Sequence, residues 1–408
     1  MAYQEQSNAL VAYKVQSALG AQASGADATI LRQAGGQGGR LTKAAVESAE
    51  IRADMMSSRG RHGVQKTNGA YTSELSLGSH DAILEAVMRG TYSSADLAIT
   101  EATAGLTSIT TTANTIVASA GSWITAGLRV GDVIRLTNHS TAANNGRNLR
   151  ITGLTASTIT VAETLTVDAV ADTAFTVTRP GRSLINPATP TKRYFTIEEY
   201  ETDIDSSEIF TDCVWGSLRM SMQPNGLFMV DTTWVGSGQF ETKTSAEAPH
   251  FTSPAQATGI PLAALEATVR KGSVDLVDLT AFDLTIDITP SAPDVIASRY
   301  APDVFTGTMQ VSMNLTTLRK DLLDVADFLD ETPLSLHVLL VEPEGEPKDF
   351  VSIHVPNFTL GSVDKSALAK AGGGRTQTLA VPAALVGKDD RGGAFDPTMI
   401  KLQVSNAA

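Results

Sequence analysis

The stretch YTSELSLGSHDAILEAVMRG, residues 71–90, changes its hydrophobic period halfway along. Its first seven residues alternate with period two, which predicts a strand with one buried face; the residues on that face are Tyr71, Ser73, Leu75 and Leu77. The remainder predicts a short amphipathic helix, with Ser79 as its N-cap and Gly90 as a left-handed stop. The apolar stripe of this helix consists of Ile83, Leu84, Val87 and Met88.

The same succession of strand and helix occurs in TGTMQVSMNLTTLRKDLLDVADFL, residues 306–329. The strand is predicted by the alternation of Met309, Val311, Met313 and Leu315. Thr316 or Thr317 can cap the helix that follows. The apolar residues through which we expect this second helix to pack include Leu322, Val325 and Leu329.

The strands expected around the two stretches also correspond in order. One strand is predicted before each stretch, at 46–52 and at 279–290, and three strands are predicted after each helix. The fold class is therefore mainly β, with two tandem units of β-barrel or β-sandwich type that each contain one short helix. The first unit is expected to comprise 46–92 and 193–260, and the second 261–408.

The units differ in the connection after the helix. It is a few residues long in the second unit but about a hundred long in the first, and a structureless loop of that length is improbable. Within 97–178, short runs of Thr, Val and Ile alternate between clusters of Gly and Asn. We therefore expect residues 93–192 to form an inserted small all-β domain that decorates the first unit.

The first 45 residues are rich in Gly, Ala and Gln, and we expect them to be too polar and glycine-rich to form a core of their own, although they contain apolar anchors. This composition predicts an extended N-terminal arm over 1–45 that becomes ordered when copies assemble. The arm's expected contacts between assembled copies are Leu10, Val11, Ile30 and Leu31.

The net charge of −13 is concentrated in the last part of the chain, because residues 193–408 carry fifteen Lys and Arg against thirty Asp and Glu. Such a surface repels a nucleic-acid backbone. The sequence also contains neither a long apolar run nor a signal-peptide pattern, so we expect no membrane insertion by this chain.

Motifs for chemistry are missing from the sequence. The glycine-rich segments 35–40 and 371–375 lack the spacing of a phosphate-binding loop. His337 and His354 fall on strands expected to be adjacent, although two structural histidines are a better explanation than a metal pair. Acidic pairs occur at Glu198 with Glu199, Asp203 with Asp205, and Asp389 with Asp390, but the tryptophans that could form sugar platforms are scattered, so solvated charged faces explain the pairs better than a glycosidase site. Cys213 has no His/Asn pattern beside it. We therefore expect no enzyme activity, no catalytic or metal-binding residues and no cofactor.

The order of these elements resembles the tail tube (major tail) proteins of long-tailed bacteriophages. The resemblance rests on the Gly-x-Tyr strand at 69–71, the following helix, and FTDCVWGSLRM at 210–220, with ESAEIRADMM upstream. It implies stacked rings around a channel for the viral genome, in which strands from each unit form an inner barrel and the helices pack outside. Two units per chain favour a trimeric ring with pseudo-sixfold symmetry, and a hexamer is the alternative.

Partners and location also follow from the resemblance. It implies self-association, contacts with a tape-measure protein and with tail-terminator or tip proteins, and double-stranded DNA that passes through without specific binding. It places the protein in the virion tail, assembled in the bacterial host cytoplasm. A β-domain protein that binds carbohydrate at a virion or cell surface is the alternative function; it explains the inserted domain but not the repeated unit.

Overall fold

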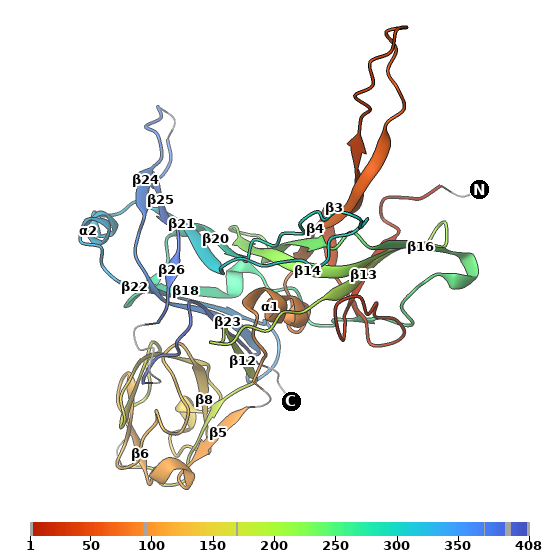
Figure 1. Ribbon diagram of the computed structural model, residues 1–408. Helices are drawn as coiled ribbons and strands as arrows, with labels where there is room; N and C mark the ends of the chain where they lie inside the picture. The colour runs from red at the N-terminus through yellow and green to blue at the C-terminus, as the bar shows by residue number, and fades with distance from the viewer. Residues whose placement is uncertain (1–2, 94–95, 169, 371, 388–392, 406–408) are drawn as a thin grey trace.

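The computed structural model describes residues 3–93, 96–168, 170–370, 372–387 and 393–405 (Figure 1). The fold is mainly β, with three sheets and two α-helices in this part of the chain. Short 3₁₀ turns occur at Thr103–Gly105, Ala142–Asn144, Ser245–Glu247 and Ala264–Glu266. Among the described residues, no helix has the length and apolar character that crossing a membrane requires.

The largest sheet contains a continuous run of eight antiparallel strands, which we call the long sheet. In spatial order its strands are β3 (Gln33–Val46), β4 (Arg61–Glu74), β15 (Met229–Gly236), β14 (Ser206–Met222), β20 (Leu279–Asp287), β21 (Gln310–Leu318), β25 (Thr376–Val381) and β24 (Ser362–Lys365). Both predicted alternating strands, in β4 and β21, are confirmed, since Tyr71, Val311 and Met313 are buried.

The first half of β14 leaves the long sheet and pairs with a second layer. This layer contains β1 (Ala9–Val15), β2 (Thr29–Ile30), β13 (Phe195–Glu201), β16 (Phe240–Thr244) and β17 (Ala255–Gln256). Because β1 pairs along its whole length with β13, and β3 lies in the long sheet, the expected N-terminal arm over 1–45 is wrong for the folded chain. The expected strand at 46–52 is wrong too, because β3 ends at Val46.

A second sheet of seven strands lies entirely within the predicted insertion. In spatial order its strands are β5 (Leu97–Thr100), β11 (Thr176–Arg179), β8 (Val133–Thr137), β9 (Leu149–Leu154), β10 (Thr158–Val161), β7 (Thr115–Ala118) and β6 (Ile109–Thr111). It encloses its own hydrophobic core around Trp123 and Phe175.

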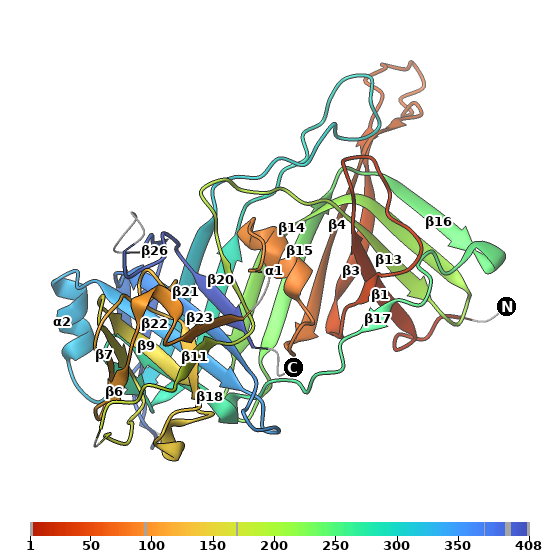
Figure 2. The ribbon, with the colours of Figure 1, turned by 90° about the horizontal axis from the view of Figure 1, so that it is seen from below.

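The third sheet packs against the apolar face of the second half of the long sheet, and it lies in front of β20 and β21 in the view from below (Figure 2). Its order is β12 (Arg182–Ile185), β27 (Lys401–Val404), β23 (Phe350–Phe358), β22 (Leu334–Val341), β18 (Ala267–Lys271) and β19 (Val274–Leu276), with β26 (Ala384–Leu385) paired to β23. The strand β12 lies in the expected insertion 93–192 but pairs with β27, so the segment that returns from the insertion belongs to the body of the protein.

The two helices are α1 (Asp81–Met88) and α2 (Leu323–Leu329), and their expected caps are wrong. The hydroxyl of Ser79 bonds to the backbone of Ser76 instead of capping α1, and Thr316 and Thr317 lie inside β21. At the end of α1, Arg89 and not Gly90 has the left-handed conformation (φ 54°). Gly90 is required for space, because a Cβ there would lie 2.4 Å from the carbonyl oxygen of Ile185.

The long sheet consists of two halves with the same internal order. In the first half β3, β4, β15 and β14 are neighbours in that order, and in the second half β20, β21, β25 and β24 repeat it. The 17 residues of β14 correspond to β23 and β24 together, since both segments start in an outer layer and cross into the long sheet at a glycine. A Cβ at either glycine, Gly216 or Gly361, would collide with a proline ring. The tandem repeat is therefore present in the strand pairing as well as in the order of elements.

Candidate assembly interface

The long sheet has one polar face and one apolar face. In β20 the buried residues Phe282, Leu284 and Ile286 alternate with half-buried polar ones, and in β21 Ser312 and Asn314 are likewise less buried than the apolar residues between them. Alternation of this kind places every second side chain on the core and the others toward water. The polar face is available to line a water-filled space.

The cation at the centre of the polar face is paired with carboxylates. Arg219 on β14 donates from Nε to Oδ2 of Asp283 on β20 at 2.8 Å, and its Nη1 lies 3.5 Å from Oδ2 of Asp231. The hydroxyl of Thr72 donates to the other oxygen of Asp231 at 2.7 Å. The hydrogen bond to Asp283 and the nearby carboxylates raise the pKa of Arg219. Its guanidinium is thus already paired and is a poor site for a phosphate group.

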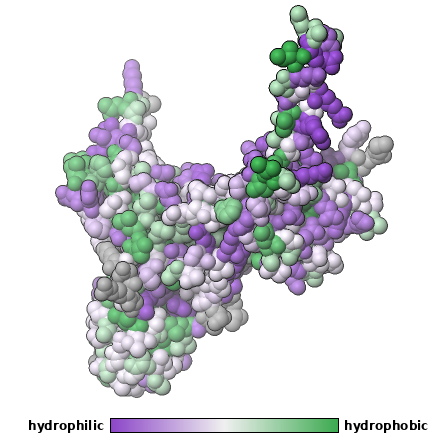
Figure 3. Space-filling model, in the orientation of Figure 1, coloured by the Kyte–Doolittle hydropathy of each residue, from purple (hydrophilic) through white to green (hydrophobic). Residues whose placement is uncertain are grey.

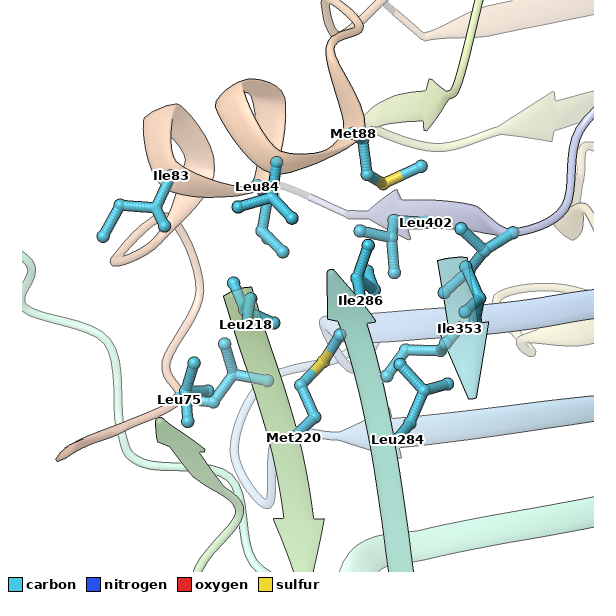
Figure 4. Close-up of a cluster of buried hydrophobic side chains, with 14 of the residues drawn as sticks. Leu75, Ile83, Leu84, Met88, Leu218, Met220, Leu284, Ile286, Ile353 and Leu402 are labelled. Atoms are coloured by element: carbon cyan, nitrogen blue, oxygen red, sulfur yellow. The ribbon is translucent and has the colours of Figure 1, made fainter. Parts of the chain in front are cut away.

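The apolar face is covered by α1 where the two halves of the long sheet join, as the close-up in Figure 4 shows. The predicted packing residues Ile83, Leu84 and Val87 are all buried. Side chains of α1 lie over residues of β14 and β20 and near residues of the third sheet; the labelled neighbours are Leu218, Met220, Leu284, Ile286, Ile353 and Leu402. Full burial of a leucine-sized side chain contributes about 1.5–3 kcal/mol, so α1 secures the junction between β14 and β20.

The second helix is placed differently from what its sequence predicts. Leu322 and Leu329 are 64 % and 72 % exposed, and Val325 is only half-buried. Phe328 provides the contact of α2 with the core, and the helix lies next to β24. The expectation that Leu322 and Leu329 pack within the chain is therefore wrong, and the helix equivalent to α1 presents apolar side chains to solvent.

The four predicted contact residues of the N-terminal segment lie within the fold. Val11 and Leu31 are buried, while Leu10 and Ile30 are half-buried. Pairing of β1 with β13 and β2 explains this burial. Val11 and Leu31 are consequently not free to bind another copy without unfolding of β1 or β2.

The exposed apolar group of the N-terminal region is instead the turn between β3 and β4, residues 47–60. Figure 1 shows that this hairpin extends far beyond the sheets, and Figure 3 shows hydrophobic residues on it. Ile51 and Met55 are 98 % and 97 % exposed, and Met56 is 67 % exposed. The sequence pattern predicted a strand in this region, whereas the structure has a projecting turn with three exposed apolar side chains.

The two ends of the long sheet are unpaired in the described chain. There, β3 pairs with β4 alone and β24 with β25 alone. An unpaired strand presents backbone donors and acceptors that can bind another strand. Both ends are therefore candidate sites for pairing with further copies.

The remaining candidates for chemistry have structural explanations. The rings of His337 and His354 lie 5.2 Å apart, and the hydroxyl of Ser352 hydrogen-bonds to His337 Nε2 at 2.7 Å. Burial and the positive charge of Lys401 lower the pKa of His354 to about 3, and burial also lowers the pKa of His337. Across the described residues, no three His, Cys, Asp or Glu side chains gather as a metal site requires.

Glu198, Cys213 and the glycine segment 35–40 also occupy structural positions. Glu198 accepts hydrogen bonds from Ser207 and from the backbone of His250 and Phe251, which explains its burial. Burial raises the pKa of the Cys213 thiol well above its ordinary value. Residues 35–40 lie within β3 and form no loop, whereas Asp389 and Asp390 fall outside the described residues.

A comparison with protein families matches residues 6–383 to a family described as phage tail tube protein. This match covers nearly all of the chain, including the inserted sheet. Among curated proteins, none matches the chain.

Proposed function

Since the chain belongs to the phage tail tube protein family, we propose that it polymerises into stacked rings that enclose a channel for delivery of the viral genome. It is a structural component of the virion tail. Copies assembled in the bacterial host cytoplasm would complete one another's sheets, so that the unpaired strands of one copy are covered by the next. Ring closure also removes the exposed sheet edges that favour aggregation.

The repeat within the long sheet is the observation on which this proposal rests. The junction of β14 with β20 joins two halves of identical strand order inside one chain. A second junction of the same kind, between copies, would extend the sheet from one copy to the next. This extension ends when the last copy pairs with the first and the ring closes. We favour three chains and six halves per ring, with six chains as the alternative.

The polar face of the long sheet is proposed to line the channel. The pairing of Arg219 with Asp283 and Asp231 leaves this cation little capacity to bind phosphate. The acid excess of residues 193–408 acts in the same direction. Double-stranded DNA would therefore pass without specific binding.

Stacking of rings is proposed to use the turn between β3 and β4. Its exposed residues Ile51, Met55 and Met56 extend beyond the sheets, where they can reach a neighbouring ring. Apolar surface buried on contact supplies the favourable free energy. This turn replaces Leu10, Val11, Ile30 and Leu31 as the proposed site of contact between rings.

The inserted sheet is proposed to decorate the outside of the tube. It is fixed to the third sheet by the buried ion pair of Asp132 with Lys401 (2.7 Å) and by hydrogen bonds between Gln403 and the backbone of Val133. Figure 1 shows that it hangs from the body away from the long sheet. Contacts with tape-measure, tail-terminator and tip proteins would use the inside and the two ends of the tube.

Negative-stain imaging of the purified chain tests the proposal, and native mass spectrometry of any rings determines the number of chains. We expect rings or tubes with three chains per ring. Six chains per ring would replace the trimer by the hexamer. A chain that remains monomeric at every concentration would contradict tube formation itself.

A further inference from the structure

The register of the internal junction specifies how one copy meets the next. We propose that β24 of one copy pairs antiparallel with β3 of a second copy, so that Asp364 lies directly opposite Arg40. This inference rests on the proposed ring assembly and assigns its contact. The occupant of both free edges is a second copy of this chain.

The internal junction provides the template. Its register is regular: Ser217 of β14 lies opposite Asp287 of β20, Leu218 opposite Ile286, and Arg219 opposite Thr285. The ion pair of Arg219 with Asp283 crosses this junction on the polar face. An equivalent junction between copies therefore needs the counterpart of β14 on one side and the counterpart of β20 on the other.

The counterpart of β14 at the free end of the sheet is β24. The sequence GSLR at 216–219 corresponds to GSVD at 361–364, and both segments follow the glycine at which the strand enters the long sheet. Register agrees with sequence, since Leu218 lies opposite Thr232 of β15 and Val363 lies opposite Leu379 of β25. Asp364 thus occupies the position of Arg219.

The counterpart of β20 at the other end of the sheet is β3. Thr232 also lies opposite Tyr71, and Leu379 lies opposite Leu315. Tyr71 of β4 and Leu315 of β21 therefore occupy equivalent positions. Three residues earlier in each strand, Asn68 lies opposite Arg40 and Ser312 lies opposite Thr285. Arg40 therefore occupies the position of Thr285, which in the internal junction is the partner of Arg219.

Superposing the two correspondences gives three cross-strand pairs: Ser362 with Thr42, Val363 with Leu41, and Asp364 with Arg40. Directly opposite residues in antiparallel strands have Cβ atoms about 4.5–5.5 Å apart, which permits contact between an acid and a base.

The exposure of these residues in the single copy fits the three pairs. Arg40 and Asp364 are both exposed, whereas Leu41 and Val363 are both half-buried, as expected for the polar and apolar faces. In the single copy Asp364 accepts a hydrogen bond from the Ser362 hydroxyl, so its carboxylate has a local partner and room for a second. The register stops before Gly39, whose N–H already donates to Glu199. The opposite charges of Arg40 and Asp364 and the similar exposure of the paired residues do not follow from the strand order, so they support the register independently.

The position of α2 supports the same contact. Its equivalent α1 spans the internal junction, with apolar side chains over both β14 and β20. The helix α2 lies next to β24, and Leu322, Leu323 and Leu329 remain 64 %, 68 % and 72 % exposed. A second copy whose β3 pairs with β24 would bring its apolar face under α2, which explains why this helix is only partly covered in a single chain.

Cysteine crosslinking tests the register. We expect the variant with Arg40→Cys and Asp364→Cys to form disulfides between copies under mild oxidation, yielding covalent rings on a denaturing gel. The matched control combines Arg40→Cys with Ser362→Cys, which moves one sulfur two residues along the same face and should crosslink much more slowly. The buried Cys213 is common to both variants.

Charge reversal provides a second measurement that does not depend on oxidation. Arg40→Asp alone and Asp364→Arg alone should each raise the protein concentration needed for assembly by roughly tenfold, and the double exchange should restore it. Circular dichroism of each unassembled variant establishes that it is folded.

The outcomes separate this junction from the ring proposal. Wild-type tubes combined with equal crosslinking in both cysteine variants, or with no effect of charge reversal, would overturn the register and leave the tube intact. Absence of rings in the wild-type protein would overturn the proposed function and this junction together.

Discussion

The two equivalent helices should respond in opposite ways to the same mutation. Leu84 on α1 is 5 % exposed, whereas Leu329 on α2 is 72 % exposed. Truncation of a buried leucine to alanine costs about 2–5 kcal/mol, because the lost burial is augmented by the cavity left behind. With about a quarter of its surface buried, Leu329 contributes roughly a quarter of the ~1.5–3 kcal/mol of a fully buried leucine. Leu84→Ala should therefore lower the free energy of unfolding by ~2–5 kcal/mol and Leu329→Ala by less than ~1 kcal/mol.

Urea unfolding of the unassembled chain, followed by tryptophan fluorescence, measures this difference. Trp215 and Trp234 are buried in the core that α1 covers, whereas Trp123 belongs to the core of the inserted sheet. A Trp123→Phe background shared by all variants therefore restricts the signal to the main core. Equal losses for Leu84→Ala and Leu329→Ala would refute the difference in packing between the helices. A larger effect of Leu329→Ala on assembly than on unfolding would agree with cover of α2 by a second copy.

Three further outcomes are expected. Arg219→Ala should change the free energy of unfolding by less than ~1 kcal/mol, because its ion pair with Asp283 is solvent-exposed; a loss of several kcal/mol would contradict a wet polar face. His354 has a pKa lowered to about 3 by burial and by Lys401, so stability present above pH ~6.5 should fall as the pH decreases toward 3, at up to ~1.4 kcal/mol per pH unit, and urea titrations of His354→Gln should show a shallower decline. Replacement of 97–179 by a short Gly/Ser linker should leave tubes that are thinner in negative stain; soluble protein without tubes would show that the inserted sheet builds the wall.

The hydrophobic periodicity of the sequence correctly predicted those strands and the helix that bury one apolar face in the core of the same chain. The alternation through Tyr71 and through Val311 identified strands of the long sheet, and the stripe at Ile83 and Leu84 identified α1. In each case the period of the sequence records which side is buried. The fold class and the repeat could be read for this reason.

Non-local pairing explains the expectations that were wrong. Residues 9–15 are mostly apolar, but the glycine-rich and polar sequence that follows them obscured this short run, and its strand partner β13 lies far along the chain. Residues 47–56 alternate like a strand, but none of the strands described in a single copy pairs with them. The apolar stripe of α2 shows that Leu322 and Leu329 favour cover, yet a pattern does not specify whether the cover belongs to the same chain. The proposed pairing of Arg40 with Asp364 depends on the register of seven strand pairs, which the sequence alone does not specify.

The strand β27 has a consequence for the order in which the protein can be built. It lies in the interior of the third sheet, between β12 and β23, although it is synthesised roughly two hundred residues after β12. Pairings of such high sequence separation form slowly and leave incomplete intermediates exposed. Until β27 has been translated, β12 and β23 lack the strand that pairs with both of them, and the surface beneath α1 near Leu402 is uncovered. Limited proteolysis of stalled nascent chains should find this sheet unprotected until β27 has emerged from the ribosome. A chain that has not yet made β27 would therefore lack part of the surface on which α1 packs.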